Sequence, residues 1–160
     1  HVNVSIDSLI PERYASIRVN ADLAEVLEHF EVYRDYCQRH GRNLCVMVNP
    51  MRVNWDEMAC FVDWCNERNV HLWFNTIRYP EHLALHNLPA ADLEVIHDTL
   101  AAAPPAPPGD RPEDDIRRNN VEVFDRFVQG QLRSWLDEAR GEPGRGVGVP
   151  VTISTGPRSS

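Results

Sequence analysis

Residues 43–49 read NLCVMVN, and Pro50 closes this run. A short apolar stretch bounded by turn residues is typical of a strand that is buried on both faces of a parallel sheet. Residues 1–7 (HVNVSID) precede it and alternate apolar with polar side chains, which is the period of a strand. Residues 70–77 (VHLWFNTI) follow it and predict a third strand. These three segments decide the fold class.

Helical patterns separate the three predicted strands. Between about residues 21 and 40, apolar side chains recur at helical spacing, and Gly41 supplies a stop. A second helix is predicted to begin at Asn54, which together with Glu57 comes close to a capping box. Its buried stripe would contain Met58, Phe61, Val62 and Cys65. Strands joined through helices run parallel, with right-handed crossovers, so the sequence predicts an α/β fold.

The chain divides into four predicted parts. A shorter helix introduced by Pro89 completes an α/β domain over residues 1–100. Residues 101–112 (AAAPPAPPGDRP) are expected to form a Pro-rich linker, and residues 113–140 an accessory helix. Residues 141–160 are expected to be a disordered tail. Because three parallel strands alone leave their edges unpaired, we expect the domain to be part of a larger sheet or barrel.

Composition narrows the classes of partner. The 160 residues are 42% hydrophobic and 25% charged, which is typical of a globular protein. The net charge of −8 argues against nucleic acid and anionic membrane surfaces as partners. No apolar run approaches the roughly 18 residues that a membrane span needs. The four cysteines lie within apolar patterns, which favours reduced, buried thiols in a cytoplasmic protein over a disulfide framework.

Polar residues end the predicted strands. Ser5 and Asp7 end the first strand, and Asn49 ends the second. Ligands of parallel α/β proteins gather at the carboxyl ends of the strands, so we expect these side chains to contact a small polar ligand. The alternative is that they begin turns or cap helices. The pattern predicts neither a catalytic residue nor a set of metal ligands.

The same residues resemble a known family. Residues 1–8 (HVNVSIDS) and 14–37 (YASIRVNADLAEVLEHFEVYRDYC) resemble the fourth strand and following helix of the radical S-adenosylmethionine (radical SAM) superfamily. Many members have a Ser-x-Asp strand end followed by an Ile-Arg pair, which Ile17 and Arg18 match here. Residues 46–70 resemble the fifth strand of that family and its helix. Residues 71–100 resemble the sixth strand and the helix that follows it.

This resemblance implies a fold and a cofactor. The fold would be half of a parallel, TIM-like β/α barrel, namely strands 4–6 of the radical SAM core, followed by the C-terminal helix and tail. Ser5, Asp7 and Asn49 would contact the ribose and amino-acid parts of S-adenosylmethionine. Arg18 would bind the cofactor carboxylate, which its planar guanidinium meets with two hydrogen bonds. The alternative for Arg18 is a surface ion pair with an acid such as Asp22.

The resemblance also implies chemistry that this sequence cannot perform alone. Radical SAM enzymes cleave S-adenosylmethionine reductively at a [4Fe–4S] cluster and abstract hydrogen from a small-molecule or peptide substrate. Their C-x3-C-x2-C cluster motif does not occur among residues 1–160, so we expect the cluster ligands to lie in a separate N-terminal half barrel. Two other interpretations remain open: a non-catalytic half-barrel interaction module, or an α/β domain that binds another small metabolite.

Overall fold

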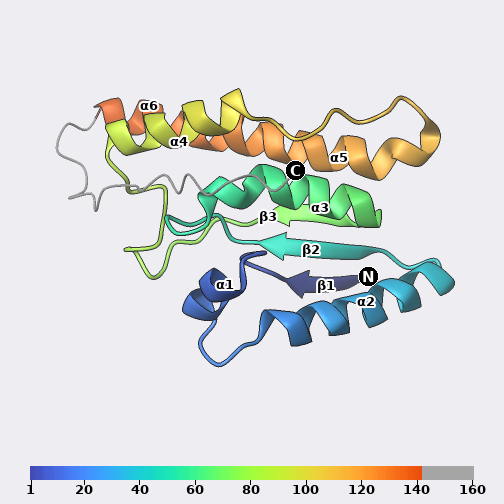
Figure 1. Cartoon of the computed structure of the whole chain (residues 1–160). Coiled ribbons are helices and arrows are strands. Elements are labelled where there is room, and N and C mark those ends of the chain that lie inside the picture. The colour runs from blue at the N-terminus through green and yellow to red at the C-terminus, as the bar shows by residue number, and fades with distance from the viewer. Residues whose placement is uncertain (142–160) are drawn as a thin grey trace.

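The computed structural model describes residues 1–141, which form an α/β fold around a three-stranded parallel sheet (Figure 1). The strands are β1 (Val2–Ser5), β2 (Leu44–Val48) and β3 (His71–Phe74), with β2 in the centre. All three predicted strands are present, each shorter than its sequence pattern. The helices are α1 (Pro11–Ile17), α2 (Leu23–Arg39), η1 (Trp55–Glu57), α3 (Met58–Arg68), α4 (Ala90–Ala102), η2 (Pro112–Asp114), α5 (Asp115–Asp125), the π-helical η3 (Arg126–Leu132) and α6 (Arg133–Gly141).

Local signals explain the ends of the first two helices. The Asp22 side chain accepts a hydrogen bond from the Ala24 amide at 2.8 Å and so caps α2. Gly41 has a φ of +58°, a conformation that glycine adopts without steric cost, and the predicted stop is confirmed. Helix α1 was not predicted from the pattern, although Pro11 occupies its first turn, where a missing amide hydrogen costs nothing.

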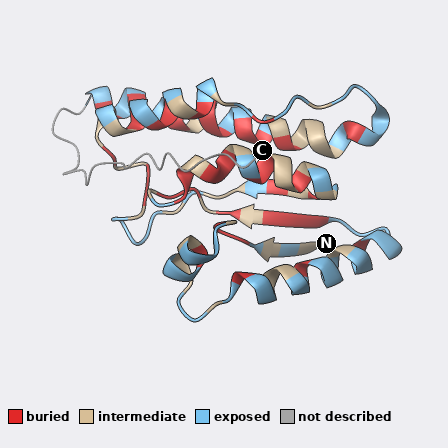
Figure 2. Ribbon diagram, in the orientation of Figure 1, coloured by how far each residue is buried: buried red, intermediate tan, exposed pale blue. Residues whose placement is uncertain are grey.

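Helices cover one face of the sheet. α2 and α3 lie side by side on this face, where the rings of Phe30 and Trp64 are 4.9 Å apart. Val46 and Leu72 belong to the buried core cluster. Figure 2 shows most of β2 in the colour of buried residues. On the opposite face Ser5 is exposed and Trp73 retains 47% of its accessible surface. One side of the sheet is therefore core, and most of the other side is open to solvent.

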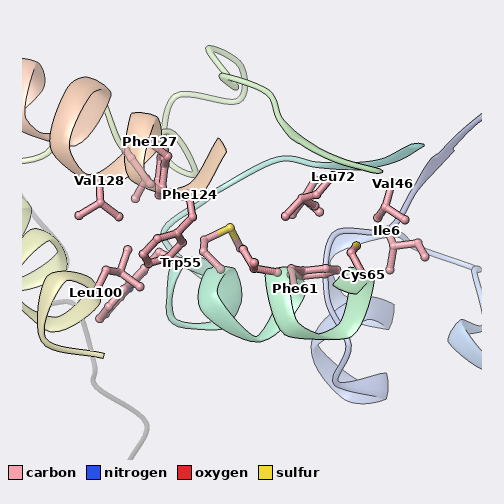
Figure 3. Packing of buried hydrophobic residues seen from close by; sticks show 14 of the residues in the cluster. Ile6, Val46, Trp55, Phe61, Cys65, Leu72, Leu100, Phe124, Phe127 and Val128 are labelled. Carbon is pink, nitrogen blue, oxygen red and sulfur yellow. The ribbon is translucent and has the colours of Figure 1, made fainter. Parts of the chain in front are cut away.

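The C-terminal helices continue the same core. In Figure 3 the side chains of Phe124, Phe127 and Val128 lie beside Trp55 and Leu100, and the cluster extends across α3 to the sheet. The expected helix over 113–140 is thus packed into the domain, and its π-helical segment spans the Gly130 interruption. The predicted disordered tail lies outside the described residues, except for Gly141 at the end of α6.

The prediction of half a barrel is wrong. The sheet has only three strands, and α5 runs along the outer side of β3. The Asn120 amide from α5 accepts a hydrogen bond from Leu72 N–H at 2.8 Å and donates one to the Val70 carbonyl at 2.9 Å. The Asn120 side chain therefore bonds to two main-chain groups on the outer edge of β3, where a fourth strand would otherwise pair, and the sheet formed by residues 1–141 ends at β3. Strand patterns alone do not reveal such a closure, because Asn120 is distant in sequence.

The outer edge of β1 differs from that of β3. Val2 and Ile6 donate their amide hydrogens towards β2, to Asn43 and Met47, at 2.9 and 3.1 Å. The alternate residues of β1 direct their main-chain groups away from β2, where none of residues 1–141 pairs with them. The sheet is thus closed beside β3 and open beside β1.

Candidate functional site

Asp7 lies directly beyond β1, at the carboxyl end of the sheet, and is 3% exposed. Its Oδ1 accepts hydrogen bonds from the Asn49 main-chain and side-chain nitrogens at 3.0 and 2.8 Å. Its Oδ2 contacts Nε and Nη2 of Arg18 at 2.9 and 2.8 Å. A carboxylate has about four acceptor positions, and these nitrogen atoms fill them. We call Asp7, Arg18, Asn49 and Asn54 the Asp7 network.

Asn54 links the main chains of Asp7 and Asn49 in this network. It is fully buried, and its Oδ1 accepts from the Met51 amide at 2.7 Å. Its Nδ2 donates to the main-chain carbonyls of Asp7 and Asn49 at 2.6 and 3.0 Å. The side chain does not cap the helix that it precedes, so the capping box predicted with Glu57 is wrong. Asn54 instead ties together the loops that follow β1 and β2.

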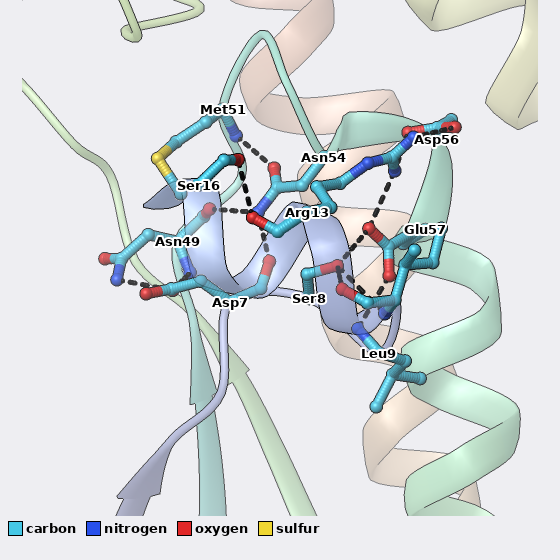
Figure 4. A network of polar contacts seen from close by, with 11 residues as sticks. Asp7, Ser8, Leu9, Arg13, Ser16, Asn49, Met51, Asn54, Asp56 and Glu57 are labelled. Atoms are coloured by element: carbon cyan, nitrogen blue, oxygen red, sulfur yellow. Dashed lines mark hydrogen bonds and ion pairs between the residues drawn. The ribbon is translucent and has the colours of Figure 1, made fainter. Parts of the chain in front are cut away.

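Glu57 is the centre of a neighbouring set of contacts (Figure 4). Its carboxylate is buried and accepts hydrogen bonds from the Ser8 hydroxyl and the Leu9 amide, both at 2.7 Å. Arg13 of α1 bridges Glu57 and Asp56, with 2.7 Å to each. These contacts fix α1 against the start of α3, and they position the segment that carries Asp7 and Arg18.

Burial and charge change the acidity of two groups beside these networks. Burial would lower the pKa of Arg13, but the hydrogen bonds and charges of Asp56 and Glu57 outweigh it and raise that pKa. Burial raises the pKa of the Tyr14 hydroxyl, and the Asp7 charge adds to the effect while Arg18 opposes it. Both groups therefore keep their protons more firmly than they would in water.

Some polar groups at this end of the sheet are not used within the described part of the chain. Ser5 is exposed and its hydroxyl bonds to none of residues 1–141. The Oδ1 of Asn49 and the Nη1 of Arg18 likewise have no hydrogen-bond partner there. Arg18 is partly accessible, with a side-chain exposure of 38%. A hydroxyl, an amide oxygen and a guanidinium nitrogen thus remain available to a ligand.

The structure brings together three of the four predicted site residues. Arg18 and Asn49 both bond to Asp7, whereas Ser5 lies two residues earlier on the open face. The alternative of a surface ion pair with an acid such as Asp22 is not what the structure has, because Arg18 pairs with the buried carboxylate of Asp7. Sequence reasoning missed the contacts of Glu57 and the tertiary role of Asn54. The polarity of Glu57 inside an otherwise apolar helical stripe was the available signal.

Metal ligands are not grouped in the described residues. Residues 1–141 contain no cluster of three or more His, Cys, Asp or Glu side chains that could hold a metal ion. The cysteines are spread over α2, β2 and α3, and Cys60 is exposed, contrary to the prediction that all four are buried. The arrangement does not fit an iron–sulfur cluster. Within the same residues, none of the helices has the length and apolarity that crossing a bilayer requires.

Comparisons of this chain with protein-family models, with curated proteins and with solved structures find no match. The resemblance to the radical SAM superfamily therefore rests only on the motifs quoted above.

Proposed function

We propose that this chain supplies part of the S-adenosylmethionine site of a radical SAM enzyme, with the [4Fe–4S] cluster held by ligands outside residues 1–160. The observation that carries the proposal is the convergence of Asp7, Arg18 and Asn49 at the carboxyl end of β1 and β2. The family motif assigns these residues to the cofactor site, and they lie near the carboxyl ends of parallel strands, where ligands generally bind.

The contacts suggest a division of work within the network. Because Asp7 already meets four donor nitrogens, we assign it the positioning of Arg18 and Asn49. Arg18 would then bind the cofactor carboxylate through its remaining nitrogen, and Asn49 and Ser5 would bind ribose hydroxyls. The cofactor, when bound at the cluster, supplies the radical chemistry, and the side chains of this chain bind and orient it.

The test compares two ligands by calorimetric titration of the chain joined to the half that holds the cluster. S-Adenosylmethionine carries the carboxylate, and 5′-methylthioadenosine lacks the whole amino-acid part. Arg18→Gln should weaken binding of S-adenosylmethionine by about tenfold, the loss of one charge-assisted hydrogen bond, and leave methylthioadenosine unchanged. The matched control is Arg42→Gln, since Arg42 is exposed at the opposite end of β2.

The proposal fails if the joined protein does not bind S-adenosylmethionine, or if Arg18→Gln weakens both ligands equally. A C-x3-C-x2-C motif in the coding sequence upstream of His1 would be an independent point in its favour.

The second candidate is a non-catalytic interaction module. The saturation of the Asp7 carboxylate favours it, because a side chain with every acceptor position filled is fully explained by a role in folding. In that case neither adenosyl ligand binds.

A further inference from the structure

A groove of about 370 Å³ runs between the end of β3 and the π-helical segment η3. Its volume lies in the range of small-molecule pockets, roughly 300–1,000 Å³. We call it the Trp73 groove, and its defining residues are Trp73, Asn75, Thr76, Arg126, Phe127 and Gln131. None of them belongs to the Asp7 network.

The apolar wall of the groove is an exposed indole. Trp73 retains 47% of its surface, although large aromatic side chains usually bury most of theirs. Beside it, the Phe74 ring packs edge-on against Phe127 with 5.4 Å between centroids, so the base of the groove is fixed. A rigid floor with an open indole is suited to stacking a planar ring.

On the polar side of the groove, the Arg126 charge and the Asn75 side-chain amide are not paired within residues 1–141. Arg126 donates from Nε to the Glu122 carbonyl at 3.4 Å, and it forms no ion pair within the described chain. Asn75 donates its main-chain amide to Val48 at 2.8 Å, while its side-chain amide bonds to none of these residues. Thr76 and Gln131 hydrogen-bond to each other and hold the strand end to the helix.

Arg126 is the first residue of the π-helical segment and lines the groove. Phe127, Val128 and Leu132 of the same segment are buried, whereas Arg126 is exposed and Gln131 is half-buried. π-Helical segments are frequent at functional sites. No carboxylate of residues 1–141 forms an ion pair with Arg126, so its guanidinium can meet an external carboxylate with two hydrogen bonds.

We propose that the Trp73 groove binds an aromatic carboxylate. The ring stacks on the Trp73 indole, the carboxylate pairs with the Arg126 guanidinium, and the Asn75 amide donates a further hydrogen bond. Because the two sites share no residue, the groove can bind its ligand whether or not the Asp7 network meets S-adenosylmethionine.

The probes are 1-naphthoate and its neutral analogue 1-naphthalenemethanol, titrated into the full chain. Binding is followed in ¹H–¹⁵N spectra by the main-chain amide signals of Asn75 and Thr76, which every variant retains. Where Trp73 is present its indole N–H signal is followed as well, and Trp73→Phe assigns that signal among the four tryptophans. The parent should bind naphthoate more tightly than the alcohol. Arg126→Gln should weaken naphthoate by about tenfold and leave the alcohol within about twofold, while Trp73→Ala weakens both.

The matched control is Arg133→Gln, which removes the same charge from an exposed residue outside the groove. It should leave both affinities unchanged. The proposal is overturned if the Trp73 signal does not move up to the solubility limit of naphthoate. It is also overturned if Arg126→Gln weakens the two probes equally, or if Arg133→Gln acts as Arg126→Gln does. Thermal melts of each variant verify that it is folded.

Discussion

The carboxyl end of the sheet has two regions that differ in how far their polar groups are hydrogen-bonded within the protein. Beyond β1 and β2, the buried polar groups of the Asp7 network satisfy one another, and few of their atoms remain available. Beyond β3, the Trp73 groove leaves an indole, an amide and a guanidinium open. Polar residues that follow one strand can therefore serve folding, while those that follow the next strand of the sheet keep unused hydrogen-bonding groups. Residue type alone does not distinguish the two cases.

The largest expected effect is a difference in the free energy of unfolding between variants of two asparagines, Asn54 and Asn75. Asn54→Ala removes hydrogen bonds from the Met51 amide and from two carbonyls in a fully buried place. We expect the free energy of unfolding in urea to fall by about 3 kcal/mol, as is typical when buried polar groups lose their partners. Asn75→Ala in the groove is the matched control and should change it by less than about 0.5 kcal/mol. Equal losses would mean that the two regions do not differ in this way.

A smaller effect is expected for the carboxylates. Asp7→Ala leaves Arg18 and Asn49 without their acceptor, and the expected loss is about 2 kcal/mol, within the range for hydrogen bonds to charged groups. Asp125→Ala, next to Arg126, removes an exposed carboxylate and should be nearly neutral. Urea titrations of both variants give the comparison. A neutral Asp7→Ala would show that the Asp7 network does not contribute to stability.

The smallest expected effect appears only in alkali. Burial raises the pKa of Tyr14 in the folded state, so below the unfolded value of about 10 its contribution is fully present. As the pH rises from the unfolded pKa through the folded pKa, the hydroxyl of Tyr14 loses its proton in the unfolded chain first. The free energy of unfolding therefore falls over this range of pH. Melting temperatures between pH 9 and 11 should therefore fall less for Tyr14→Phe than for the parent. Tyr79→Phe, at a residue that is 78% exposed, should follow the parent curve.

Much of the fold could be predicted from periodicity. The strands, helix α2 and its end at Gly41 are local features, because apolar spacing and a positive φ are encoded within a few residues. The carboxyl-end location of Asp7 and Asn49 followed from the parallel order. Each of these inferences used neighbouring residues only.

The errors share a cause in long-range contacts. Asn54 suggested a helix cap, but its partners include Asp7, 47 residues earlier. Glu57 suggested a capping box, but it binds Ser8 and Leu9 across the domain. Asn120 carried no signal for the closure of β3, and so the barrel was predicted where the sheet in fact ends. Side-chain amides that bond to a distant backbone have no sequence period.

The closure of β3 by Asn120 has a consequence for self-association. Exposed strand edges are the usual starting points of open-ended β-aggregates, which need two free edges per molecule. Within residues 1–141 one edge is free, beside β1, since the Asn120 amide bonds to main-chain groups on the other. Two copies of this part of the chain that paired through β1 would form a single sheet with an Asn120 at either end. For residues 1–141, edge pairing through β1 is therefore expected to favour a dimer over an open-ended sheet.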